Sequence, residues 1–291
     1  VVEDVLRLGG MPVVTHPDSP KPELAWRDWD LPVAGLEWLN LDSGWRDESY
    51  ARVARVAVDY LVRPGPALAS LLERPTSALS RWDELAARRK MVGLAGHDVH
   101  GGLSPRREEG TQEIPSGFVA NAFTTYEASF ATFGVRVLLD GPLTGDAAAD
   151  ARRLLAATRR GRVYTAIDAI AGPAVVDYRA TIGGSTIGMG EEAGFVDGAA
   201  LTFRSTMSPG AVQVLLRDGI EVAESRDGEL RFSAPGPGAY RVEVRDLRWP
   251  VPWIATNPIY LRGAAHDQAP EVLEPVTIAS RSVDLNPSAV E

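Results

Sequence analysis

The sequence predicts an α/β layer over its first part and a β-sandwich over its second. Up to about residue 171, short apolar runs alternate with segments of helical periodicity, which is typical of a parallel α/β layer or barrel. After about residue 172, short runs with period-2 character are separated by turn signals, which is typical of a β-sandwich. We therefore expect an α/β unit at 1–171, a β-sandwich at 172–262 and a loosely ordered, proline-bearing tail at 263–291.

Length and composition limit the functions to consider. A chain of 291 residues can bury one core or two. Its formal charge of -9 and the lack of a basic stripe disfavour extended nucleic-acid binding. No apolar run approaches the roughly 18 residues that cross a bilayer, so we expect no membrane partner. The absence of cysteine excludes disulfides, thiolate metal sites and a cysteine nucleophile, but it does not decide the compartment.

The first part begins with a helix and two strands. Residues Val1–Leu8 have helical apolar spacing, and Gly9 and Gly10 follow as a stop signal. Strands are expected at Val13–Thr15 and Ala34–Asn40, with a proline- and tryptophan-rich loop between them.

Helices and strands alternate from there on. Helical periodicity predicts helices at Glu48–Val62, Ala67–Leu72, Ser77–Lys90 and Asp146–Arg160, the first of them ending before Pro64. Apolar runs predict strands at Val92–Ala95, Val135–Leu139 and Val163–Ile167. The Gly/Arg/Glu-rich segment 101–116 is long enough to be a functional lid.

The second part consists of strands alone. Alternating patterns predict them at Val175–Thr181, Ala200–Thr206, Ala211–Leu216, Glu221–Ser225, Leu230–Ser233, Ala239–Arg245 and Trp253–Leu261.

Three of the four histidines directly follow predicted strands. His16 follows the first strand, and His97, Asp98 and His100 follow the third. Barrels keep their chemistry at the carboxyl ends of strands, and imidazole and carboxylate are usual ligands of zinc, manganese and iron. Asp98 and His100 are two residues apart, so an extended chain points both the same way. We expect His16, Asp98 and His100 to be metal ligands.

These motifs resemble the PHP family of metal-dependent phosphoesterases, named after polymerase and histidinol phosphatase, and in particular its carbaryl hydrolase-like branch. The similar segments, spread over roughly residues 1–262, are Thr15–Asp18, Gly35–Asn40, Gly96–His100, Arg160–Tyr164 and Ala255–Tyr260. The resemblance implies a distorted β/α barrel with up to three divalent ions, commonly zinc, manganese or iron. It maps His16, Asp98 and His100 onto late ligands of that site.

The sequence departs from the family at its start. The family's early ligands include a His-x-His motif, and none precedes His16 here. We therefore expect the chain to be the later part of a barrel, with the remaining ligands upstream in a longer parent. An incomplete or non-catalytic metal-binding fragment, whose β-domain binds a partner or a polymer, is the alternative to an enzyme. Another possibility is that two such half-barrels assemble into a homo-oligomer.

Two more residues are candidates for catalysis. Glu37 lies on an apolar strand, where a lone carboxylate is costly unless it is paired. It either orients a histidine, acts as a base towards substrate, or makes a buried structural pair. The family often has a small residue at the position of His97, so this imidazole is an extra ligand, a proton-transferring group that supports a ligand, or a structural side chain.

Candidate substrate contacts lie in two loops. Arg106 and Arg107 are able to clamp a phosphate, or form a solvated charge run with Glu108 and Glu109. Trp26 either walls the substrate site or belongs to the core.

Together these signals predict a metal-dependent hydrolase in which a metal-activated water attacks a small-molecule substrate. A phosphoester is the substrate class that the family implies, and a carbamate or ester is the alternative from the branch. The sequence does not separate the two.

Overall fold

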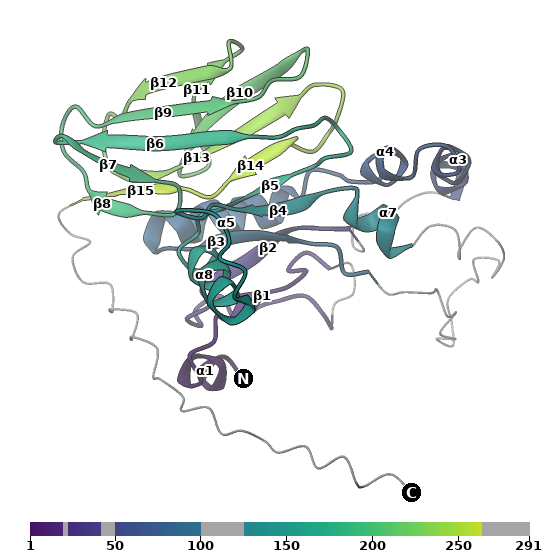
Figure 1. Ribbon diagram of the computed structural model, residues 1–291, viewed down its shortest axis with the longest axis horizontal. Helices are drawn as coiled ribbons and strands as arrows, with labels where there is room; N and C mark the ends of the chain where they lie inside the picture. Colours follow the sequence, from purple (N-terminus) through teal and green to yellow (C-terminus); the bar gives the residue numbers. More distant parts are fainter. Residues whose placement is uncertain (20–22, 42–49, 100–124, 264–291) are drawn as a thin grey trace, which may run out of the picture.

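Figure 1 shows the computed structural model, which describes residues 1–19, 23–41, 50–99 and 125–263. This part of the chain is mixed α/β with three sheets, and its strands do not close into a barrel. A three-stranded parallel sheet with helices around it lies beneath two larger sheets that face each other (Figure 1). The α/β class and the sandwich-like second part are thus present. The predicted His100, Arg106 and Arg107, the lid 101–116 and nearly all of the tail lie outside the described residues.

The parallel sheet has the order β1-β2-β3, with β1 at Val13–Val14, β2 at Gly35–Asn40 and β3 at Val92–Gly96. Both pairings are parallel, so the carboxyl ends of all three strands meet at one edge. Residues 35–39 of β2 are all buried, as expected for a central parallel strand covered on both faces.

Six described helices accompany these strands. They are α1 (Val2–Arg7), α3 (Tyr50–Tyr60), α4 (Pro64–Ala69), α5 (Thr76–Arg88), α7 (Tyr126–Phe130) and α8 (Ala147–Arg159). The apolar face of α5 packs on β2, where Leu79 and Trp82 share a core with Leu36 and Trp38.

Helices α4 and α5 begin earlier than the sequence predicts, and the difference is larger for α4. Helix α4 starts at Pro64 rather than at Ala67, because a proline in the first turn loses no helical hydrogen bond and its fixed φ suits the helix. The expected helix end before Pro64 is confirmed, since α3 stops at Tyr60.

The second part holds most of the remaining strands. Their bounds are β4 Gly134–Val137, β5 Val163–Ala166, β6 Val176–Ile182, β7 Ser185–Gly188, β8 Glu192–Gly194, β9 Ala200–Ser205, β10 Ala211–Arg217, β11 Ile220–Ser225, β12 Glu229–Ser233, β13 Gly238–Asp246, β14 Ile254–Thr256 and β15 Ile259–Arg262. One sheet has the order β11-β10-β13-β14-β5-β4, with β15 and β8 attached, and the other has the order β12-β9-β6-β7. Tyr178, Phe203, Tyr240 and Trp253 fill the core between the two sheets.

The larger sheet runs across the predicted domain boundary. Strands β4 and β5 come from before residue 171, yet β5 pairs with β14 from the second part. The division at 171/172 stays a prediction, and the hydrogen-bonded sheet is continuous across it.

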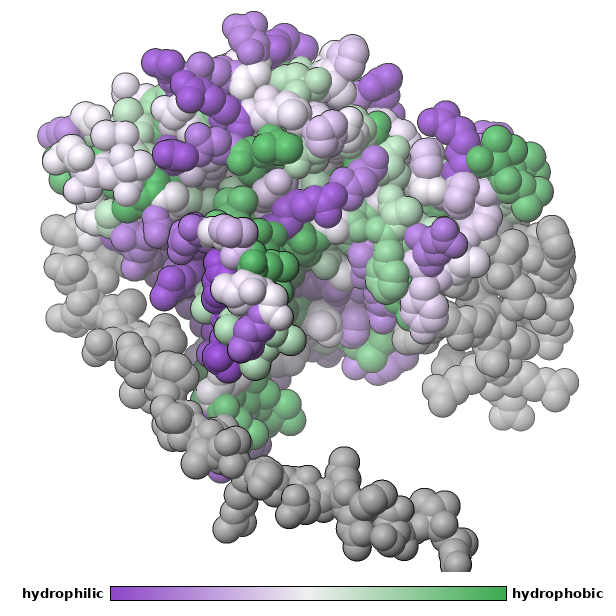
Figure 2. Space-filling view, in the orientation of Figure 1, coloured by the Kyte–Doolittle hydropathy of each residue, from purple (hydrophilic) through white to green (hydrophobic). Residues whose placement is uncertain are grey.

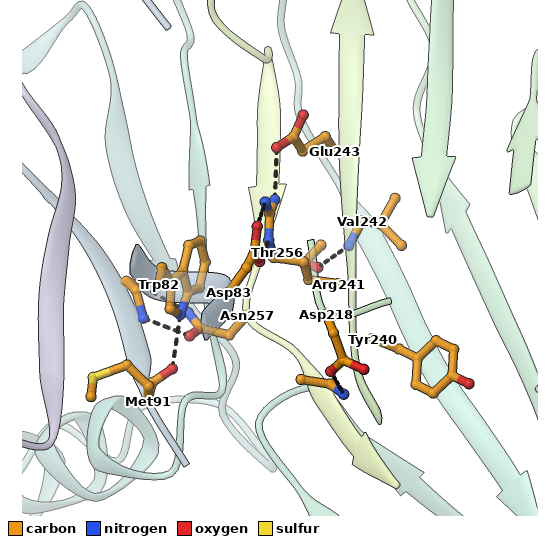
Figure 3. Close-up of polar contacts among 12 residues, drawn as sticks. Trp82, Asp83, Met91, Asp218, Tyr240, Arg241, Val242, Glu243, Thr256 and Asn257 are labelled. Carbon is orange, nitrogen blue, oxygen red and sulfur yellow. Dashed lines mark hydrogen bonds and ion pairs between the residues drawn. The ribbon is translucent and has the colours of Figure 1, made fainter. Parts of the chain in front are cut away.

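Buried polar contacts join the second part to the parallel layer (Figure 3). Arg241 of β13 binds both carboxylate oxygens of Asp83 on α5, at 2.6 and 2.7 Å, and donates to Glu243 at 2.7 Å. Arg74, just before α5, also donates two hydrogen bonds to the Glu243 carboxylate. Arg241 and Glu243 are 2% and 0% exposed, so these charges are almost fully removed from water.

Asn257 makes a second junction. Its Oδ1 accepts from the Gly93 N–H at 2.8 Å, and its Nδ2 donates to the carbonyls of Gly93 and Val163. The side-chain amide thus takes the place of a peptide group between β3 and β5. This explains why the predicted strand Trp253–Leu261 is two strands: the chain leaves the ladder at Asn257 and Pro258.

The surface varies between elements. In Figure 2 polar residues cover much of the sandwich, whereas hydrophobic residues gather over α3 at the right. Val58 in the last turn of α3 and Leu61 and Val62 just past its end are 66%, 66% and 80% exposed. None of the described helices is long and apolar enough to cross a membrane.

Candidate metal centre

The candidate centre lies at the carboxyl edge of the parallel sheet. His16 stands two residues beyond β1, Asn40 ends β2, and His97 and Asp98 follow β3 directly. The register pairs Asn40 with Gly96 across β2 and β3, so these strand ends are level. The predicted convergence of His16 and Asp98 at one edge is what this parallel arrangement produces.

Glu37 accepts hydrogen bonds from two residues at this edge of the sheet. Its Oε2 accepts from the backbone N–H of His16 at 2.6 Å and from Asn40 Nδ2 at 2.9 Å. The carboxylate lies so close to Gly96 that a Cβ added there would overlap Oε1. Glu37 therefore links the His16 backbone to the end of β2 and lies against the end of β3.

Burial raises the pKa of the Glu37 carboxyl, and the negative charge of Asp98 raises it further. The hydrogen bonds from Asn40 and from the His16 backbone, together with the charge of His16, oppose this rise without cancelling it. Glu37 is 8% exposed and is held by hydrogen bonds rather than by an ion pair with a described residue.

Both candidate ligands adopt unusual backbone conformations. His16 has φ of 34° and Asp98 has φ of 48°, in the left-handed region that L-residues seldom adopt. Such strain persists only where the surroundings enforce it, and it is frequent at functional sites.

The chemistry of His16 fits a metal ligand. Its Nδ1 is buried and has no hydrogen-bond partner in the described part of the chain, and its Nε2 makes only a 3.4 Å contact with Thr15 Oγ1. A buried imidazole nitrogen without a partner is costly, and a divalent cation is one partner that satisfies it. Among the described residues, no three His, Cys, Asp or Glu side chains form a complete ligand group.

His97 has a different setting. Its Nε2 lies 2.9 Å from the Phe133 carbonyl, and its ring stacks on Phe133 at 4.1 Å and meets the edge of Phe130 at 5.1 Å. Burial lowers the pKa of His97, although the Phe133 carbonyl counteracts this. These contacts agree with the structural alternative, in which His97 joins the end of β3 to the start of β4.

Trp26 is partly buried and packs against the core that contains Trp38. Its indole Nε1 is buried without a hydrogen-bond partner among the described residues. Packing against this core agrees with the core alternative for Trp26.

Asp18 has a role that the sequence pattern did not predict. Its Oδ2 accepts from the Ala78 N–H at 2.6 Å, in the first turn of α5. The residue at the expected cap position, Pro75, has no side-chain donor or acceptor. A carboxylate 60 residues away in the chain therefore caps the helix, and only the tertiary structure reveals this.

Comparisons with protein-family models, with curated proteins and with solved structures gave no match for this chain.

Proposed function

We propose that this chain belongs to a metal-dependent hydrolase whose metal centre includes His16 and Asp98, with a phosphoester as the substrate class. One observation supports the proposal above the others: a buried carboxylate, an unpartnered buried imidazole nitrogen and two strained residues converge at the carboxyl edge of a parallel sheet. The motif resemblance to the PHP family supplies the reaction class and places His100 in the same ligand set.

Each residue of the centre has a separate task. His16 Nδ1 and Asp98, with His100, would hold a divalent ion. Glu37 positions the His16 loop through the 2.6 Å hydrogen bond to its backbone, and Asn40 fixes Glu37 in turn. A divalent ion such as zinc, manganese or iron, if held there, would supply Lewis acidity towards a phosphoryl or carbonyl oxygen and lower the pKa of a bound water.

Metal content tests the ligand assignment. The chain is loaded with manganese or zinc, desalted and analysed for metal per chain, alongside Asp98→Asn and His16→Ala. We expect both variants to lose affinity by about tenfold or more, because each removes a ligand. Asp227→Asn is the matched control, since Asp227 is an exposed aspartate in the turn between β11 and β12. Equal metal content in all four proteins would contradict the proposal.

Turnover separates the substrate classes. Aryl phosphate monoesters, diesters and aryl carbamates are assayed with the metal-loaded chain, and Asp98→Asn should remove most metal-dependent turnover. Cleavage of the carbamate alone would favour the ester-and-carbamate alternative. Metal binding without turnover of any substrate would favour the non-catalytic alternative instead.

A further inference from the structure

A cavity of about 900 Å³ opens between the helices α3 and α4, the segment after β5 and the loop after β13. Arg52, Arg63, Asp59 and Arg248 are its charged lining residues, and Ile170 and Trp249 are its largest apolar ones. None of the described candidate residues His16, Glu37, His97 and Asp98 lines it.

The cavity is near the candidate metal centre but separate from it. Ala169, which also lines the cavity, donates its N–H to the Thr132 carbonyl, and the next residue, Phe133, stacks on His97. The cavity therefore lies close to the residues that pack on His97, although none of its lining residues belongs to the parallel sheet.

Arginine side chains give the cavity a positive charge. The cavity lining contains three guanidinium groups and one carboxylate, so it is positively charged, although the whole chain has a formal charge of -9. The exposed Arg63 side chain has no hydrogen bond or ion pair with any described residue, so no described side chain competes with a ligand for its donors.

The other two arginines are oriented by their neighbours. Arg248 donates hydrogen bonds from Nε and Nη2 to the carboxylate of the buried Asp246, and these bonds do not involve its Nη1. Arg52 donates to the Ser70 carbonyl at 2.7 Å and to Glu73 at 3.3 Å. An arginine already held in place loses less rotamer entropy when it binds an oxyanion.

The remaining wall is apolar. Trp249 and Ile170 pack against the core that includes Val251, so their positions are set by the fold. Pro66 and Ala67 of α4 complete this surface. An indole fixed next to free arginine donors suits a ligand that has a flat apolar body and one acidic group.

We propose that this cavity binds an organic oxyanion with an aromatic body, with Arg63 and Arg248 contacting the oxyanion and Trp249 contacting the ring. The site does not depend on the proposed hydrolase activity, because none of His16, Glu37 and Asp98 lines it.

Isothermal titration calorimetry with phenylphosphonate tests the site, in buffer with excess EDTA so that no divalent ion takes part. We expect saturable one-to-one binding that is tighter than that of inorganic phosphate or benzyl alcohol. Arg63→Ala should weaken binding about tenfold, because a charge-assisted hydrogen bond is lost. Trp249→Leu should weaken phenylphosphonate binding and leave phosphate binding unchanged.

Two controls make the result decisive. Arg179→Ala removes an exposed arginine of β6 on the outer sheet and should bind like the parent chain. The Arg63 side chain makes no hydrogen bond or ion pair with a described residue, and its backbone contacts with Asp59 and Ala67 survive substitution by alanine, so the melting temperature should stay unchanged. Unsaturable heats in EDTA, or equal affinity in Arg63→Ala, would overturn the proposal. Binding seen only with metal and lost in Asp98→Asn would also overturn it, while supporting the metal centre.

Discussion

At the scale of single residues, the contact between Glu37 and Gly96 decides how the candidate centre is built. The carboxylate occupies the space that any side chain at position 96 would need. Glycine is therefore required here for close approach rather than for backbone freedom, since its φ is not in the left-handed region.

Gly96→Ala should displace the Glu37 carboxylate from His16 and Asn40. The loss of these two hydrogen bonds at a buried group should lower the free energy of unfolding by about 1–3 kcal/mol. Urea denaturation measures the change. Gly194→Ala is the matched control, because a Cβ there meets nothing within 4 Å. Equal losses in the two variants would contradict the role given to Gly96.

Sequence reasoning at this scale succeeded where the signal is local. His16 and Asp98 were placed at strand ends because each follows a short apolar run. Asp18 and Asn257 were missed because their partners, Ala78 and Gly93, are 60 and 164 residues away. Nothing near either residue in the sequence indicates such a partner.

At the scale of elements, the long helices were the most predictable. Helix α8 (Ala147–Arg159) differs from the predicted range by a single residue at each end, because Asp146 caps it through the Ala149 N–H and Gly161 follows with φ of 71°. Helix α7 and strands β7 and β8 were not predicted. They contain only three to five residues each, which is too short for a period to show.

The cap of α5 can be tested by Asp18→Ala. The first turn then loses the acceptor for the Ala78 N–H, and Pro75 offers no replacement. We expect a loss of about 1 kcal/mol in the free energy of unfolding. Thermal melts of Asp18→Ala and of the exposed Asp227→Ala give the comparison, and identical melting temperatures would exclude a capping role.

At the scale of the whole molecule, charges buried between α5 and β13 hold the two layers together. Burial alone would raise the pKa of Glu243, but Arg241, Arg74 and Arg245 outweigh burial and lower it from 4.5 to about 2. Removing either partner of such a pair leaves an uncompensated buried charge.

This shift predicts acid sensitivity. Because the folded-state pKa of Glu243 is below its unfolded value, the unfolded chain binds more protons between pH 4.5 and 2. Glu243 therefore contributes stability above pH 4.5, and this contribution of about 3 kcal/mol is lost as pH falls to about 2. Urea denaturation across this range measures it. The Glu243→Gln variant should lose this part of the pH dependence, and an unchanged slope would contradict the assignment.

The amide bridge of Asn257 can be tested in the same way. Asn257→Ala leaves two carbonyls and one N–H of β3 and β5 without partners in a buried place. The expected loss is about 3 kcal/mol, and Thr186→Ala on the exposed strand β7 should cost far less. Similar losses in both variants would show that the bridge contributes little.

The sheet shared by β5 and β14 limits which parts of the chain can be exchanged in engineering. A module joined by a flexible linker can be exchanged by recombination, because each piece folds by itself. Here β5 would lose its neighbour β14, and the Gly93 backbone would lose the amide of Asn257. The β-rich part therefore shares hydrogen bonds with the parallel layer, and exchanging it alone would leave backbone groups of β3 and β5 without their present partners.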